Sequence, residues 1–338
     1  MSRKPDDPES PAGENGAPHS PMHIFGPVPS RRLGRSLGID LVPYKTCTFD
    51  CIYCDLGKTT FKTASRNPYV SAAEIRRELE LSLSTLERKP DFLTLSGSGE
   101  PTLNQNLGEI VRTIKDLSSI PLAVITNGSL LSIEEVREGL ARADVVLPSL
   151  DAVDETTFHW VNRPHPSLTI EAIISGLLQF RKQYRGQIWL EVVFCRGIND
   201  DRKEIERLKG VVEKLQPERI QLNTPVRPPA EEFAYPLTTG QLEQIRQQMG
   251  ERAEIISEFA SSMEEESNCA KDTEITNLLK RRPCTAEDIS QALGLHLEEV
   301  LKHLGKLTEK GILQYRIYQH HCYFEGASSR RGPGVEAV

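Results

Sequence analysis

Short apolar runs alternate with longer amphipathic segments along most of the chain. Six runs are rich in Leu, Ile and Val and have the length of buried strands: 36–41, 92–96, 122–126, 145–150, 188–194 and 219–224. The segments that follow them carry apolar residues at helical spacing: 72–87, 107–117, 132–141, 170–180, 201–215 and 239–249. Ser71, a typical N-cap, precedes the first of these helices. The alternation predicts six β–α units and a parallel sheet with right-handed crossovers.

Six β–α units are too few for the closed barrel of eight units. We therefore expect an α/β fold built as an open, partial (β/α)6 TIM-like barrel over residues 23–259, with a doubly wound sheet as the alternative. In either architecture, functional side chains gather at the carboxyl ends of the strands.

The pattern changes near the C-terminus. Residues 260–270 are acidic and predict a linker, and 271–326 predict a small winged helix-turn-helix domain. Its expected elements are helices near 273–281, 285–293 and 296–309, with Gly294 and Gly311 at helix ends, and strands at 312–317 and 319–324. Segments 1–22 and 327–338 are rich in Pro, Gly and charge and are expected to be flexible tails.

Composition narrows the class of protein. The 338 residues are 38% hydrophobic and carry a formal net charge of -7, which argues against broad binding to nucleic acid or anionic membrane. The sequence has no apolar run near the roughly 20 residues that span a bilayer, and its N-terminus has no apolar signal region. Residues 271–326 contain eight Lys or Arg and eight Asp or Glu, so sequence-specific DNA binding is not expected. Seven cysteines without an export signal predict reduced thiols and a cytoplasmic protein.

Three of these cysteines form a cluster in "YKTCTFDCIYCDLG", where Cys47, Cys51 and Cys54 have the spacing C-x3-C-x2-C. The cluster follows the first predicted strand, on the functional face of the sheet. Three thiolates can hold three irons of a cubane cluster and leave the fourth to a non-protein ligand. A zinc site completed elsewhere is the alternative, although no histidine lies within twenty residues on either side. The remaining cysteines are irregularly spaced, so idle thiols are favoured over an auxiliary cluster: Cys195, Cys269, Cys284 and Cys322.

The spacing, with Tyr53 before the last cysteine, resembles the signature of the radical S-adenosylmethionine (radical SAM) superfamily. "SGSGEP" at 96–101 is similar to the Gly-Gly-Glu element of that family, and "TNG" at 126–128, "PSLDA" at 148–152 and "GIND" at 197–200 end later strands. "FGPVPSRRLGRSLGIDLVPYKTC" is similar to a subgroup related to wybutosine tRNA-base synthases, many of whose members are called only iron–sulfur oxidoreductases. The chain departs from those tRNA enzymes because it has no second N-terminal cysteine cluster.

The resemblance implies a [4Fe-4S] cluster on Cys47, Cys51 and Cys54, with S-adenosyl-L-methionine (SAM) chelating the open iron. One electron would then cleave SAM to methionine and a 5′-deoxyadenosyl radical, which abstracts hydrogen from a substrate. Several residues are implied as SAM contacts, although turn chemistry is the alternative role for most of them. They are Tyr53, Gly97, Ser98, Gly99, Glu100, Asn127, Ser149 and Asp151.

Two functions of different class follow. The first is an enzyme that takes electrons from a donor such as flavodoxin or ferredoxin and acts on RNA or protein docked by the winged helix. The alternative is a redox-sensing iron–sulfur regulator that binds DNA, but a sensor would need only the cysteines. Arg31, Arg32 and Arg35 suit either a substrate anion or ion pairs along the barrel rim. We expect that truncation at about Ser267 leaves the barrel folded and able to cleave SAM.

Overall fold

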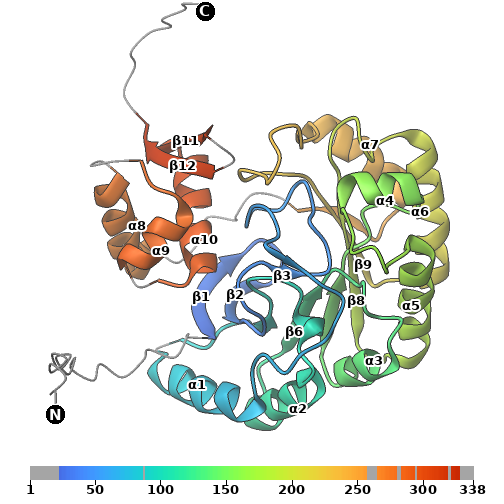
Figure 1. The fold of residues 1–338 in the computed structure, drawn as a ribbon, viewed down its shortest axis with the longest axis horizontal. Coiled ribbons are helices and arrows are strands. Elements are labelled where there is room, and N and C mark those ends of the chain that lie inside the picture. Colours follow the sequence, from blue (N-terminus) through green and yellow to red (C-terminus); the bar gives the residue numbers. More distant parts are fainter. Residues whose placement is uncertain are drawn as a thin grey trace, which may run out of the picture.

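A curved sheet with helices on its outer side forms the larger part of the molecule (Figure 1). The computed structural model describes residues 23–86, 88–256, 265–279, 283–293, 295–318 and 321–327. The expected tail at 1–22, residues 328–338 of the other tail and residues 260–264 of the expected linker lie outside this described part. No helix among the described residues is long and apolar enough to cross a membrane.

The sheet has eight strands in the order β1-β2-β5-β6-β7-β8-β9-β10. All neighbouring pairs are parallel except β1 with β2, which are antiparallel. The six predicted strands are confirmed as β2 (Gly34–Ile39), β5 (Phe92–Leu95), β6 (Leu122–Thr126), β7 (Val145–Pro148), β8 (Gln187–Val193) and β9 (Arg219–Asn223). The predicted α/β fold, with a mostly parallel and open sheet, is therefore confirmed.

The outer helices also follow the predicted pattern. They are α1 (Ala72–Thr85), α2 (Leu107–Leu117), α3 (Glu134–Leu140), α5 (Ile170–Gln183), α6 (Arg202–Leu215) and α7 (Thr239–Met249). Ser71 caps α1 in a capping box with Glu74, as its residue type predicts. The apolar faces of these helices pack on the sheet and form one continuous core.

Several elements of this part were not predicted, three of them in the main sheet or directly after one of its strands. β1 (Ile24–Ser30) is an antiparallel edge strand, β10 (Ala253–Ile255) extends the opposite edge, and α4 (Glu155–Val161) follows β7. β1 contains Pro27 and Pro29, and proline is tolerated in a sheet only at edges and irregularities. The register of β1 against β2 does shift between Phe25 and Val28.

The remaining elements form a separate small core, which we call the C-terminal module (265–327). It consists of α8 (Glu265–Leu279), α9 (Ala286–Leu293), α10 (Leu297–Glu309), β11 (Leu313–Tyr318) and β12 (His321–Gly326). The first helix begins at Glu265, so the expectation that 265–270 belong to a linker is wrong. Gly311 follows α10 with φ +67, as predicted for a helix end, whereas Gly294 lies outside the described residues. The order of elements is that expected of a winged helix, which stays a prediction.

Candidate active site

The cysteine loop leaves the carboxyl end of β2 and crosses the mouth of the barrel. Within it, β3 (Thr46–Cys47) pairs with β4 (Phe61–Lys62), which draws the two ends of the loop together. Ile52 is fully buried, and its amide donates to the carbonyl of Val161 at the end of α4. The end of the unpredicted helix α4 therefore holds the loop at Ile52, between the second and third cysteines.

Each cysteine sulfur of the loop has one side-chain nitrogen as a hydrogen-bond donor. The nitrogen-to-sulfur pairs are Asn127 Nδ2 to Cys47 Sγ at 3.6 Å, Asn162 Nδ2 to Cys51 Sγ at 3.4 Å, and Lys45 Nζ to Cys54 Sγ at 3.3 Å. The donors come from the end of β6, the end of α4 and the loop itself. Donors of this kind stabilise negative charge on sulfur, so the three positions are arranged to carry thiolates.

These donors alone do not ionise the three thiols, whose pKa values stay raised with the donors in place. Burial, followed by the Glu100 carboxylate, raises the pKa of Cys47 to about 12, and burial also raises the pKa of Cys51 and Cys54. Loading metal must therefore displace protons from these sulfurs.

The cysteines are not arranged around one shared ion. No three His, Cys, Asp or Glu side chains in the described part of the chain lie close enough to hold a single metal ion. A cubane binds each cysteine through a different iron, so it does not need the sulfurs to converge on one point. Three separated sulfurs on one short loop, each with its own donor, thus fit a cubane cluster.

Glu100 ties the end of β5 to the end of β6. Its carboxylate accepts hydrogen bonds from the Thr102 amide at 3.0 Å, the Thr126 hydroxyl at 2.7 Å and the Asn127 amide at 2.7 Å. The side chain is buried, which raises its pKa. Because Asn127 in turn reaches Cys47, Glu100 acts on the cysteine loop through Asn127; its predicted contact with SAM stays a prediction.

The glycines of "SGSGEP" allow close approach by the Asp40 carboxylate and the Thr46 carbonyl. A Cβ at Gly99 would lie 1.9 Å from the carbonyl oxygen of Thr46, and Gly97 has φ +142 against the Asp40 carboxylate. Ser98 lies between them, and both its amide and its hydroxyl donate to Asp40. These three residues therefore fasten the end of β5 to the start of the cysteine loop.

Asp151 fixes the aromatic ring that precedes the last cysteine. Its carboxylate accepts hydrogen bonds from the Tyr53 hydroxyl at 2.5 Å, Asn162 Nδ2 at 2.7 Å and the Val193 amide at 2.8 Å. Burial raises the pKa of Asp151 to about 6 and the pKa of Tyr53 well above its usual value. Asp151 thus orients Tyr53 and Asn162 together.

A cavity of about 280 Å³ lies beside the loop at the carboxyl ends of the strands, and we call it the inner cavity. Its lining includes four of the predicted SAM contacts together with one cysteine: Tyr53, Gly97, Gly99, Ser149 and Cys54. The other four predicted contacts are not among its lining residues: Ser98, Glu100 and Asp151 are buried, and Asn127 is half-buried. The site residues that sequence reasoning missed are Asp40, Lys45, Asn162, Glu298 and Lys302.

The arginines predicted near the first strand separate into different positions. Arg31 and Arg32 line the inner cavity, whereas the backbone amide of Arg35 donates to Asp91 at the opposite end of β2. Arg32 Nη1 lies 2.5 Å from Glu191 Oε2 on β8.

The scattered cysteines that the structure describes are divided between the core of the barrel and that of the C-terminal module. Cys195 is buried in the core of the barrel, Cys284 is buried in the core of the C-terminal module, and Cys322 lies on β12. The side chain of Cys269 lies outside the described residues.

Comparison with known proteins identifies the chain. Residues 41–208 match the family model of the Radical SAM superfamily. A GTPase Obg of Brachyspira hyodysenteriae is 38% identical over 87% of this chain, and the chain covers 44% of that protein. A UPF0026 protein of Helicobacter pylori is 33% identical over 89% of this chain and 99% of its own length. A radical SAM methyltransferase structure from Sphaerobacter thermophilus covers 65% of each chain with a TM-score of 0.53 and 16% identity, a similarity of fold alone.

The chain belongs to the radical SAM superfamily, and within it to the UPF0026 family. It is an enzyme of the radical SAM class, whose cofactors are a [4Fe-4S] cluster and SAM. The predicted family and cofactors are thereby confirmed, while the residues that hold the cofactors remain predictions. The chain spans less than half of the length of the Brachyspira relative.

Proposed function

We propose that this protein binds a [4Fe-4S] cluster through Cys47, Cys51 and Cys54 and places SAM in the inner cavity beside Cys54. When bound, the reduced cluster supplies one electron that splits SAM into methionine and a 5′-deoxyadenosyl radical, which takes a hydrogen atom from the substrate. The arrangement that carries the proposal is the set of three sulfurs, each with its own nitrogen donor, together with a cavity that is lined by Cys54, Tyr53 and Gly99.

The protein's own residues bind, orient and shield in this scheme. Lys45 and the two asparagines stabilise the charge of the cluster thiolates. Gly97 and Gly99 leave backbone exposed to the cavity, where SAM can approach it closely. Glu100 and Asp151 act as positioning residues, because they hold Asn127 and Tyr53 in place.

The cluster assignment predicts about four iron and four sulfide per chain after anaerobic reconstitution. Changing Cys47, Cys51 and Cys54 together to Ala should abolish iron binding and the release of 5′-deoxyadenosine under strong reductant. Cys322→Ala is the matched control, because this cysteine lies in the C-terminal module, and it should keep the full iron content. Iron that survives the triple change would assign the cluster to other residues.

The electron donor is proposed to be a small redox protein such as flavodoxin or ferredoxin, and the substrate to be RNA or protein. The regulator alternative is not favoured, because α10, the helix that would read DNA, turns toward the barrel. Two of its residues, Glu298 and Lys302, line the inner cavity. A helix in that position is not free to enter a major groove.

A further inference from the structure

The C-terminal module is fastened to the mouth of the barrel by its third helix. The ring of His296, the N-cap of α10, stacks on Phe25 of β1 with centroids 4.4 Å apart and planes 6° from parallel. His296 Nε2 also lies 3.3 Å from Asp40 Oδ2. Asp40 is the residue that holds Ser98, so α10 contacts the same carboxylate that fastens β5 to the cysteine loop.

A second attachment joins the module to the cysteine loop itself. The Tyr44 hydroxyl donates to Glu287 Oε1 of α9 at 2.8 Å. Leu56, two residues after the last cysteine, packs against the apolar core of the module. The module is therefore attached on both sides of the three cysteines.

These attachments place one face of α10 in the wall of the inner cavity. Glu298 and Lys302 are four residues apart, so they lie on the same side of the helix, and both line the cavity together with Tyr53 and Cys54. The cavity is thus closed partly by the barrel and partly by the module. A substrate bound in this cavity beside Cys54 therefore lies close to α10.

The charges around the cavity are unevenly paired. Arg32 pairs with Glu191, and Arg227 Nη1 lies 2.7 Å from Asp55 Oδ2. Two other cations line the cavity without a direct hydrogen bond or ion pair to a described residue, Arg31 and Lys302. The nearby carboxylates act on them only through their charge: Asp55 on both, Glu191 on Arg31 and Glu298 on Lys302. Unpaired cations in a half-buried wall are costly unless an anion joins them.

The surroundings of these two cations lower their pKa values even though carboxylates of the cavity act in the opposite direction. Burial and, next, the charge of Arg227 lower the pKa of Lys302 to about 8. Burial and the charges of Arg227 and Arg32 also lower the pKa of Arg31. An anion bound between them would relieve this repulsion and replace the lost hydration of both groups.

We propose that Arg31 of the barrel and Lys302 of the C-terminal module together bind an oxyanion of the substrate, a carboxylate or a phosphate, and so orient it beside Cys54. The inference rests on the proposed function, since it concerns the substrate of the same cavity. It assigns the module a part in the active site itself: α10 supplies a specificity-determining residue.

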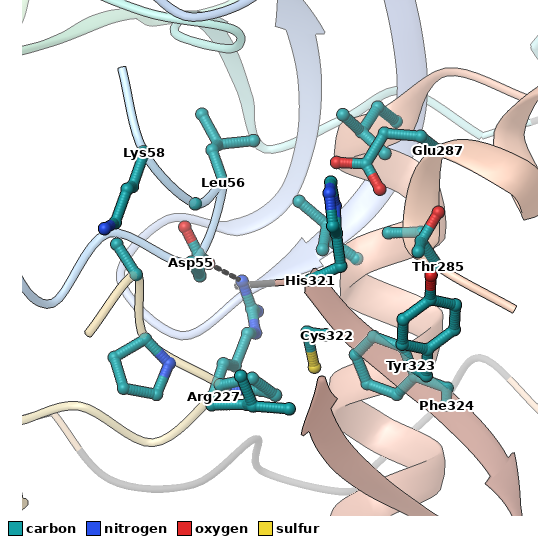
Figure 2. Close-up of a pocket in the computed structure, with 18 of the residues that line it drawn as sticks. Asp55, Leu56, Lys58, Arg227, Thr285, Glu287, His321, Cys322, Tyr323 and Phe324 are labelled. Atoms are coloured by element: carbon teal, nitrogen blue, oxygen red, sulfur yellow. Dashed lines mark hydrogen bonds and ion pairs between the residues drawn. The ribbon is translucent and has the colours of Figure 1, made fainter. Parts of the chain in front are cut away.

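A second cavity adjoins this site. This outer cavity, of about 590 Å³, lies between the cysteine loop and the module. Figure 2 shows Asp55 and Arg227 on its barrel side facing Cys322, Tyr323 and Phe324 on its module side. The Asp55–Arg227 ion pair borders both cavities, so the outer cavity adjoins the inner one at this pair.

The test measures anion binding to the reconstituted full-length protein by anaerobic calorimetry at low ionic strength, with saturating SAM present. Inorganic phosphate and malonate are the two probes and distinguish a phosphate site from a carboxylate site. Lys302→Met should lower the affinity of the protein for the preferred anion about tenfold or more, since it removes a charge-assisted hydrogen bond. Lys310→Met, an exposed lysine at the end of the same helix, is the matched control and should bind like the wild type.

Arg31→Met provides an independent variant on the barrel side, for use if Lys302→Met does not fold. Equal affinity in the Arg31, Lys302 and Lys310 variants would overturn the proposal, as would wild-type protein that binds neither anion in the presence of SAM. Iron content and release of 5′-deoxyadenosine by the wild type test the proposed function separately from the anion site. If the wild type loads iron and cleaves SAM, but neither Arg31→Met nor Lys302→Met changes the affinity for the anion, only the anion site is refuted.

Discussion

At the scale of single residues, two buried carboxylates organise the site without facing the inner cavity. Glu100 gathers donors from Thr102, Thr126 and Asn127, and Asp151 gathers donors from Tyr53 and Asn162. Each carboxylate thus holds one asparagine that reaches a cysteine sulfur. A displacement of either carboxylate would therefore be transmitted to a cysteine sulfur through one asparagine side chain.

Glu100→Ala tests this positioning role. The substitution leaves the Thr126 hydroxyl and the Asn127 amide without their acceptor, so the turn that follows β6 should loosen beside the cavity. We expect SAM affinity of the reconstituted protein to fall about tenfold or more, with iron content unchanged. Titration calorimetry with SAM and iron analysis measure the two quantities.

The control for Glu100 is Glu109→Ala, an exposed carboxylate in the first turn of α2. It should keep the wild-type affinity for SAM. Unaltered SAM binding in Glu100→Ala would remove this residue from the site, whereas loss of iron would show that Glu100 supports the cluster loop more than the SAM pocket.

At the scale of elements, the site depends on how closely the end of β5 approaches the cysteine loop. The carbonyl of Thr46 occupies the space where a Cβ at Gly99 would stand, at 1.9 Å. Because that neighbour is backbone, it cannot turn aside as a long side chain would. The whole loop would have to move to admit one methyl group.

Gly99→Ala should therefore lower both stability and iron loading. We expect a loss of roughly 1–3 kcal/mol in the free energy of unfolding, as for other overpacked sites, and incomplete cluster assembly. Gly210→Ala, in the middle of α6 with open space around it, is the control and should stabilise slightly. Denaturant titration and iron analysis of both variants give the comparison, and a Gly99→Ala protein with full iron content would contradict the argument.

The elements that the sequence did not predict share physical causes. β1 was missed because its prolines argue against a strand, and only its place at a sheet edge makes them tolerable. α4 is too short for helical periodicity to be visible, and β10 has three residues. The long periodic helices and the continuous apolar strands carried enough pattern to be predicted, including the Ser71 cap.

The site was predictable to the extent that it is local in sequence. The spacing of the cysteines and the turns after β5, β6 and β7 lie in short segments that a single sequence displays. Lys45 was within reach of such reasoning, because it stands two residues before Cys47. Lys302 was not, since only the packing of α10 on β1 brings it to a loop some 250 positions earlier in the chain.

At the scale of the whole molecule, the module and the barrel share a cavity and an apolar contact. Removal of the module would expose Phe25 and Leu56, which now pack against it. It would also open the inner cavity on the side of Glu298 and Lys302. A cut at Ser267 would divide α8, so a clean boundary lies after Ile256 instead.

A chain that ends at Ile256 should fold, since the sheet and its helices form their own core. We expect it to melt roughly 5 °C or more below the full chain, because it leaves apolar side chains uncovered. It should load iron, but it should lose affinity for the preferred anion. Scanning calorimetry and anion titration check these outcomes. An unchanged melting temperature would refute the contribution of the module to the stability of the barrel.

One glycine of α10 places a constraint on how this protein can diverge. A Cβ at Gly305 would come within 2.8 Å of Arg227 Nε, the guanidinium that pairs with Asp55 next to Cys54. A side chain added at position 305 would displace this guanidinium, so the residue at 305 and the Asp55–Arg227 ion pair are coupled. Substitutions at position 305 of the module and position 227 of the barrel are therefore expected to occur together among related sequences, so the evolution of one part is linked to that of the other.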